Sequence, residues 1–178
     1  ASDLLPSLRE VHVPSSEQRW AGFRLICFGY FKKMVIADQF APAVNSVFSA
    51  PVMTTSSPVL WTIMIMFAIQ IYCDFSGYTD IARGLAKWMG YDFPVNFNRP
   101  YEAVSMQDFW RRWHISLSSW FRDYVYFPLG GSRGSEFKAH QNAWITMLLS
   151  GLWHGAAWTF IAWGAVHAAC LSFERVTD

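Results

Sequence analysis

Charged side chains are scarce in this sequence. They account for 15% of its 178 residues, compared with about 25% in an average soluble domain. Residues 142–173 contain no Lys, Arg, Asp or Glu at all. The net charge is only +1, and the basic residues are interspersed with acidic ones rather than gathered into a patch that nucleic acid would require. The scarcity of charge favours a membrane protein, and we expect no nucleic-acid partner.

Cysteine and the common catalytic motifs are also missing or rare. The three cysteines, Cys27, Cys73 and Cys170, lie far apart in apolar surroundings, which is typical of small buried residues rather than of disulfides or a metal site. The sequence lacks a Gly-x-Ser-x-Gly elbow, a phosphate-binding loop, a dinucleotide-binding fingerprint and a zinc-protease motif. We therefore expect no metal and no bound cofactor. Because the chain begins with Ala1 and shows no leader segment, we expect it to be an excerpt from a longer protein.

Apolar and aromatic residues are abundant. They make up 53% and 18% of the chain, with ten Trp. The mean hydropathy is nevertheless only +0.16, so amphipathic or interfacial segments must dilute the apolar ones. No stretch shows the two-residue alternation of a β-strand. The composition predicts helices, some inside a membrane and some at its surface.

Apolar periodicity and helix-breaking residues divide the chain into segments. We predict a loop over 1–19, membrane helices over 20–40 and 59–91, a loop over 41–58, an amphipathic interfacial helix over 105–126 and a membrane segment over 142–173. The charges of the first helix fit either a helix that enters the bilayer at a slant or one that lies partly in the interface, with its lysines reaching lipid headgroups. The last segment is too long for one untilted span, and either one tilted helix or two helices broken near Gly155 fit it.

The distribution of basic residues predicts an orientation. Residues 41–82 contain no Lys or Arg, whereas residues 83–138 contain Arg83, Lys87, Arg99, Arg111, Arg112, Arg122, Arg133 and Lys138. Loops rich in Lys and Arg face the cytoplasm in most membrane proteins. We therefore expect the 83–138 side to be cytoplasmic.

His154 is the sharpest candidate for a catalytic residue. It lies near the middle of the uncharged segment, where an ionisable side chain is costly and by default suggests a functional site. Gly151 and Gly155 flank it at a spacing that lets another helix or a substrate approach the backbone. A neutral imidazole there would serve as a proton acceptor. On these grounds alone, a structural histidine hydrogen-bonded between helices fits the same pattern.

His114 is the second candidate, on the predicted amphipathic helix. It follows Arg111 and Arg112, whose guanidinium groups suit an anionic group such as the phosphates of an acyl carrier. Binding of lipid headgroups explains the two arginines equally well. His167 lies thirteen residues after His154, about 220° round a continuous helix, so the two cannot share a metal unless the helix breaks.

Asp74 and Asp80 lie at the end of an apolar run, and each is near a tyrosine. They fit a proton relay or the orientation of a histidine. Helix capping and structural hydrogen bonds at the membrane boundary fit them equally well.

Four motifs, taken together, resemble the membrane-bound O-acyltransferase family. They are the run from Gln107 to Tyr126, which contains Arg-Arg-Trp-His-Ile-Ser-Leu, and the segments Asp74-Phe-Ser-Gly-Tyr-Thr-Asp80, Asn96-Phe-Asn-Arg-Pro100 and Gly151-Leu-Trp-His-Gly155. The similarity covers residues 15–178. Within the family, the chain is most similar to bacterial proteins that acetylate exported polysaccharides such as alginate.

The resemblance implies an all-α, polytopic integral membrane protein with transmembrane, re-entrant and interfacial helices. Residues 1–178 would be the central to C-terminal catalytic part of a single such domain. The family's near-invariant histidine corresponds to His154, and its second characteristic polar position corresponds to His114. With Arg111 and Arg112, we expect Ser118, Trp153 and Asp74 to take part in binding substrate or donor.

The same resemblance implies an activity and a location. The donor would be acetyl-CoA or another acetyl thioester on the cytoplasmic side, and the partner a periplasmic polysaccharide acetyltransferase or relay protein. The protein would be a multi-pass protein of the bacterial inner membrane, in contact with lipid. Three alternatives stay open: D-alanyl transfer to teichoic acid, a proton-coupled transporter or flippase, and a non-catalytic scaffold subunit.

Overall fold

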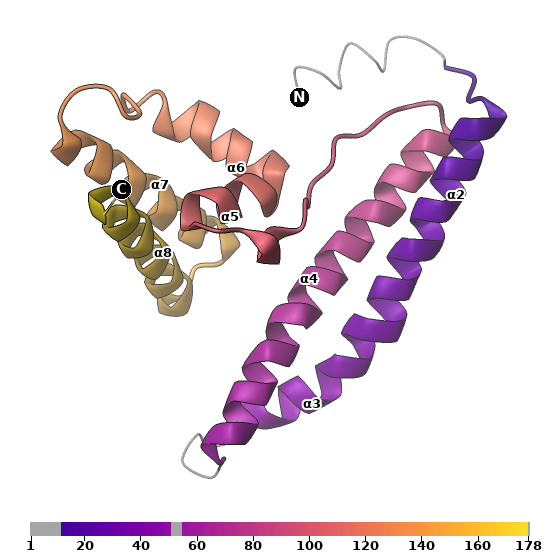
Figure 1. The fold of residues 1–178 in the computed structure, drawn as a ribbon, viewed down its shortest axis with the longest axis horizontal. Helices are drawn as coiled ribbons and strands as arrows, with labels where there is room; N and C mark the ends of the chain where they lie inside the picture. The colour runs from indigo at the N-terminus through magenta and orange to yellow at the C-terminus, as the bar shows by residue number, and fades with distance from the viewer. Residues whose placement is uncertain (1–11, 51–54, 178) are drawn as a thin grey trace. The chain divides into compact units, whose positions relative to one another are not determined.

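The computed structural model describes residues 12–50 and 55–177, and every regular element in them is a helix. The chain divides into two compact units, Ala1–Pro94 and Val95–Asp178, and each is described by itself (Figure 1). Residues 1–11 of the loop predicted over 1–19 lie outside the described residues, and the loop ends earlier than predicted, because the first helix begins at Ser16. The expectation that both units belong to one catalytic domain stays a prediction.

The first unit is a long helical hairpin. One arm contains α2 (Ser16–Tyr30), the π-helix η1 (Phe31–Ala37) and α3 (Asp38–Phe48). Ser15 begins this arm with a capping box, because its hydroxyl accepts the Gln18 N–H while the Gln18 side chain accepts the Ser15 N–H.

The loop predicted from residue 41 begins later, because α3 continues through Pro42 as far as Phe48. A proline removes one N–H donor and tends to kink a helix, but here the turns of α3 pack against α4.

The other arm is α4 (Ser57–Trp88), a helix of 32 residues with Pro58 in its first turn. At 1.5 Å per residue it is about 48 Å long, and the hydrocarbon core of a bilayer is about 30 Å thick. Among the helices of residues 12–50 and 55–177, α4 alone is long and apolar enough to cross a membrane. The helix predicted over 59–91 thus begins two residues earlier and ends three residues earlier than expected.

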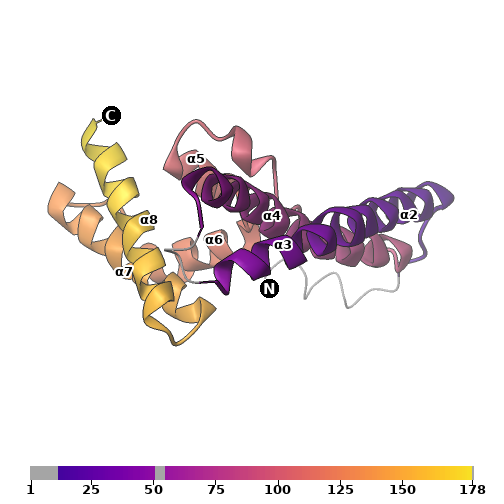
Figure 2. The same ribbon diagram turned by 90° about the horizontal axis from the view of Figure 1, so that it is seen from below.

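Glycine packs against glycine where the two arms meet. A Cβ atom added to Gly22 would lie 2.6 Å from the carbonyl oxygen of Gly84, and one added to Gly29 would lie 2.6 Å from that of Gly77. The two glycines of each arm are seven positions apart, so they recur on one face of each helix. Both views show α2 and α4 side by side (Figures 1 and 2). The helices approach to backbone contact because these positions carry no side chain.

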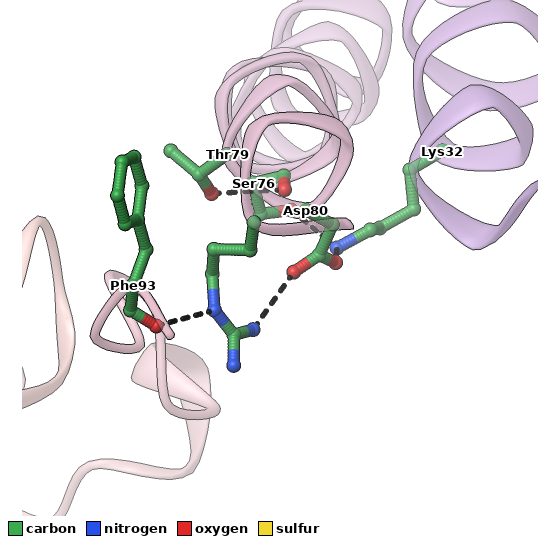
Figure 3. A network of polar contacts seen from close by, with 6 residues as sticks. Lys32, Ser76, Thr79, Asp80 and Phe93 are labelled. Carbon is green, nitrogen blue, oxygen red and sulfur yellow. Dashed lines mark hydrogen bonds and ion pairs between the residues drawn. The ribbon is translucent and has the colours of Figure 1, made fainter. Parts of the chain in front are cut away.

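A charged network crosses the same interface. The Lys32 ammonium group lies 2.5 Å from a carboxylate oxygen of Asp80 and donates to the Ser76 hydroxyl at 3.1 Å. Arg83 lies 3.3 Å from the other Asp80 oxygen and donates to the carbonyl of Phe93 (Figure 3). Only 9% of the Lys32 side chain is exposed. The prediction that this lysine reaches headgroups is wrong, because the carboxylate on α4 binds it inside the hairpin.

The second unit contains the histidines of interest, and its described residues, 95–177, form five helices. They are α5 (Met106–Arg112), α6 (Ile115–Phe121), the π-helix η4 (Arg122–Tyr126), α7 (Glu136–His154) and α8 (Trp158–Thr177), and a short 3-10 turn, η3 (Pro100–Glu102), precedes them. The single helix predicted over 105–126 is therefore wrong. It is divided at Trp113 and His114, where the backbone leaves the helical region.

The uncharged segment predicted over 142–173 is two helices, and α7 begins six residues earlier, at Glu136. The chain turns after Gly155, so that α8 packs against α7 (Figures 1 and 2). Gly151 on α7 approaches the carbonyl of Phe160, and Gly164 on α8 approaches that of Met147. At the other end of the pair, Arg175 lies 2.6 Å from Glu136. With 19 and 20 residues, both helices are long enough to cross a membrane, but neither is as apolar as α4.

The glycine contacts generate a prediction in which close packing and helix propensity change the stability in opposite directions. Alanine is about 1 kcal/mol better than glycine inside a helix, but overpacking costs about 1–3 kcal/mol. Because a Cβ at residue 77 would lie 2.7 Å from the Gly29 carbonyl oxygen, Gly77→Ala should lower the melting temperature of the full-length protein in detergent. Leu85→Ala, at an exposed position of α4, is the control and should change it little. A higher melting temperature for Gly77→Ala would contradict the close approach.

The buried network generates a second prediction. Asp80→Ala leaves the Lys32 ammonium group buried without its carboxylate, and breaking a buried ion pair costs about 3–5 kcal/mol. Asp92→Ala removes the partner of Lys87, and 64% of the Asp92 side chain is exposed, so a loss of about 0–1 kcal/mol is expected. Unfolding of the two variants by denaturant measures the difference. Equal losses of unfolding free energy in the two variants would show that Lys32 is solvated.

Candidate active site

His114 occupies the break between α5 and α6. Its backbone is left-handed, with φ 42° and ψ 56°, and it is the residue immediately before α6. Left-handed backbone costs an L-residue roughly 1–2 kcal/mol, and residues held in it often lie at functional sites. The break takes the imidazole out of the regular helical array that the sequence predicts. The backbone at His114 is therefore strained, and contacts with neighbouring segments must stabilise it.

The segment that precedes α5 holds this break. The N–H of Asn98 donates to the Arg112 carbonyl at 2.9 Å, and the N–H of Ile115 donates to the Asn96 carbonyl at 2.9 Å. The Asn96 side-chain oxygen accepts both the N–H and the hydroxyl of Ser116, each at 3.0 Å. These hydrogen bonds thus join the Asn-Phe-Asn motif to the Arg-Arg-Trp-His motif.

Ser118 also supports the break. Its hydroxyl donates to the carbonyl of Trp113 at 3.0 Å, which satisfies an acceptor left free where α5 ends. The expectation that Ser118 binds substrate stays a prediction.

The start of α5 is tied to the end of α8. The carboxylate of Glu174 accepts the N–H of Met106 at 2.8 Å and that of Gln107 at 3.0 Å. Ser105 accepts the N–H of Asp108 at 3.0 Å. These bonds satisfy N–H groups that have no partner within a helix. They attach α5, and with it the break at His114, to the pair of α7 and α8.

The two arginines before His114 have different partners. Arg112 lies 2.8 Å from the Asp108 carboxylate, and this hydrogen bond lowers the pKa of Asp108 and raises that of Arg112. Arg111 donates to the side-chain amide of Gln107 at 3.2 Å, which is neutral. Among the described residues, the charge of Arg112 is therefore compensated by a carboxylate close by, while Arg111 contacts an uncharged side chain.

Trp153 contacts both candidate histidines. Its ring is 6.3 Å from that of His114 and 5.0 Å from that of His154, both edge-on. The His114 ring also stacks on Phe97 at 6.4 Å. His154 is the last residue of α7. The fold brings His114 and His154 together from segments 40 residues apart, in contact with the same indole.

His167, on α8, is a third histidine next to these aromatic rings. The Trp163 ring lies 5.2 Å from His154 and 4.6 Å from His167, and Trp110 lies 5.1 Å from His167. The break after α7 makes this possible, because it folds α8 back along His154. Within the described residues, however, no group of three or more His, Cys, Asp or Glu forms a metal site.

Burial determines the charge of His114. Loss of hydration lowers the pKa of this imidazole from 6.5 to about 4, and the nearby His154 adds to the effect. His114 is therefore neutral at pH 7. A neutral imidazole has one nitrogen that donates and one that accepts a hydrogen bond.

Asp74 belongs to the other compact unit. Its carboxylate lies 2.6 Å from the Lys33 ammonium group, which also lies 3.0 Å from Asp38. These contacts fit a structural role between η1 and α4. Its predicted part in binding stays a prediction.

Sequence reasoning found the histidines but missed their supports. Asn96 lies in the segment before α5, whereas Trp163 and Glu174 both lie on α8, and periodicity says nothing about contacts between segments. The only available signal was the Asn-Phe-Asn-Arg-Pro motif, whose polar residues stand in a stretch without apolar periodicity.

Comparison with known proteins identifies a family that this sequence matches. The model of the membrane-bound O-acyltransferase family matches residues 13–178. The chain is 50% identical over 147 residues to the probable alginate O-acetylase AlgI of Azotobacter vinelandii, covering 83% of this chain and 29% of that protein. It is 40% identical to the peptidoglycan O-acetyltransferase of Helicobacter pylori, over 98% of this chain and 33% of that protein.

More distant relatives carry a different printed activity. The teichoic acid D-alanyltransferase of Bacillus subtilis is 33% identical, over 86% of this chain and 40% of that protein. The chain spans only about a third of the length of these three relatives. The family match covers both units and all four sequence motifs, and the chain belongs to the membrane-bound O-acyltransferase family.

Proposed function

We propose that this chain is the catalytic part of an O-acetyltransferase that moves an acetyl group from a cytoplasmic thioester, such as acetyl-CoA, toward an exported polysaccharide such as alginate. The observation that carries the proposal is the pair of histidines at Trp153, together with 50% identity to a probable alginate O-acetylase. A periplasmic acetyltransferase or relay protein would complete delivery to the polymer.

His154 is the general base in this proposal. Its imidazole takes the proton of the acceptor hydroxyl while the oxygen attacks the carbonyl carbon of the thioester. The C–S bond then breaks, the thiolate leaves and is protonated, and an acetyl ester remains. The position of His154 supports this role, because it is exposed at the end of α7, beside the turn at Gly155. A side chain there is accessible to two reactants, whereas one in mid-helix would face a packed neighbour.

His114 has a different role. Because it is neutral, its ring can donate a hydrogen bond to the carbonyl oxygen of the donor or to the acceptor. Trp153, which contacts both rings, would shape the space for the acetyl group. Arg111 is better suited than Arg112 to a donor phosphate, because Asp108 already binds Arg112.

We place the protein in the bacterial inner membrane with several spans. Support comes from the family and from α4, the spanning candidate among the described helices. The basic residues of 83–138 support a cytoplasmic position for that side, where thioester donors are made. The interfacial position expected for residues 105–126 fits the short α5 and α6, which have seven residues each.

D-alanyl transfer to teichoic acid is the second candidate. The 33% identity to the Bacillus subtilis enzyme favours it, but this is lower than the identity to the O-acetylases. Membranes that contain the full-length protein, supplied in parallel with labelled acetyl-CoA and a D-alanyl carrier thioester, separate the two. Transfer of D-alanine without acetate would overturn the acetyl assignment.

The role of His154 predicts a large kinetic effect. A positioned general base contributes about 10²- to 10⁴-fold, so His154→Ala in the full-length protein should reduce labelled acetyl transfer by that factor. His140→Ala is the control, because it changes a histidine of the same helix outside the cluster of His114, Trp153 and His154. It should leave acetyl transfer near the wild-type rate. If membrane-inserted His154→Ala transfers acetyl at the wild-type rate, the assignment is wrong.

The neutral state of His114 predicts a pH dependence of stability. The folded protein holds this imidazole with a pKa of about 4 instead of 6.5, so between these values the unfolded chain binds more protons. Stability should therefore fall as the pH is lowered from 6.5 toward 4. His114→Asn removes the titrating group, and its unfolding midpoint should fall less over this range. Identical pH slopes for the two proteins would contradict a half-buried, neutral His114.

A further inference from the structure

Asn96 forms hydrogen bonds to the break at His114 through both its main chain and its side chain. Its main-chain carbonyl accepts the N–H of Ile115 at 2.9 Å, and its side-chain oxygen accepts the N–H and hydroxyl of Ser116 at 3.0 Å each. These two residues follow His114 directly. One asparagine thereby satisfies the first two N–H groups of α6, which have no partner within the helix.

The other side of the break is held by the same short segment. The N–H of Asn98 donates to the carbonyl of Arg112 at 2.9 Å. The bonds from residues 96 and 98 therefore enclose Trp113 and His114 on both sides. Between them lies Phe97, which stacks on the His114 ring at 6.4 Å with an interplanar angle of 16°.

These contacts explain how a strained conformation persists. A left-handed residue costs roughly 1–3 kcal/mol unless its surroundings hold it. Without the bonds of Asn96, α5 and α6 can relax toward one continuous helix, which is what the sequence of residues 105–126 favours locally. In a continuous helix His114 would point along a different direction and lose its place beside Trp153.

We propose that Asn96 is a positioning residue for acyl transfer: its side chain holds the break that presents His114 to Trp153 and to the reacting groups. This inference rests on the proposed function of His114. It assigns to the Asn-Phe-Asn segment the task of orienting the Arg-Arg-Trp-His segment.

The test combines single and double variants of the full-length protein in acetyl transfer from labelled acetyl-CoA. A small misplacement of a reacting group costs up to about 10²-fold, so Asn96→Ala should lower kcat by about 10- to 100-fold with little change in KM. Asn96→Asp retains an acceptor oxygen and should recover most of the rate. Asn98→Ala is the matched control, because Asn98 holds Arg112 through its main chain and that bond survives the substitution.

The double variant distinguishes positioning from general stability. If Asn96 acts through His114, Asn96→Ala combined with His114→Ala should be no slower than His114→Ala alone. Multiplicative losses, or an Asn96→Asp variant as slow as Asn96→Ala, would overturn the inference while leaving the role of His114 intact. A His114→Ala variant with wild-type kcat would overturn both that role and the inference.

A milder variant serves if Asn96→Ala does not accumulate in the membrane. Ser116→Ala removes only the hydroxyl donor to Asn96 and leaves both main-chain bonds in place. It should lower kcat by about 3- to 10-fold, an effect of one neutral hydrogen bond, and the loss should disappear in the His114→Ala background. An unchanged kcat, or a loss that persists in that background, would overturn the inference.

Discussion

Close approach of helix backbones at glycine is the constraint on which both units depend. In the first unit, Gly22 and Gly29 meet Gly84 and Gly77 across the hairpin. In the second, Gly151 meets the carbonyl of Phe160, which brings α8 against α7. Helices in a membrane gain little from the hydrophobic effect between themselves, so van der Waals contact and hydrogen bonding must hold them together. Small residues make that contact possible.

Close packing also controls the placement of charge. Lys32 lies near the close approach of Gly29 and Gly77, and Ser76 and Asp80 meet its ammonium group from α4. In the second unit, the ends of α7 and α8 are joined by Glu136 and Arg175. A chain with few charges thus uses several of them to connect one helix to another.

The candidate site follows from two interruptions of helical structure. One lies at His114, between α5 and α6, and the other follows His154, between α7 and α8. Each interruption presents an imidazole at a helix end, where other segments supply some of its neighbours. The first is held by hydrogen bonds from residues 96 and 98. The second is held by the packing of Phe160 and Trp163 on the His154 ring.

The sequence by itself determined the helical class, the apolar character of α4 and the two histidines that the fold unites. It did so because apolar periodicity and composition are local properties, and because an ionisable residue in an uncharged segment is conspicuous. It predicted a continuous helix through His114 because residues 105–126 are compatible with one over their whole length. It also left open whether residues 142–173 form one helix or two. Only the tertiary structure decided these points, since hydrogen bonds from Asn96 and the packing of α8 are contacts between distant segments. Such contacts compensate for broken helical turns that local preference alone would keep.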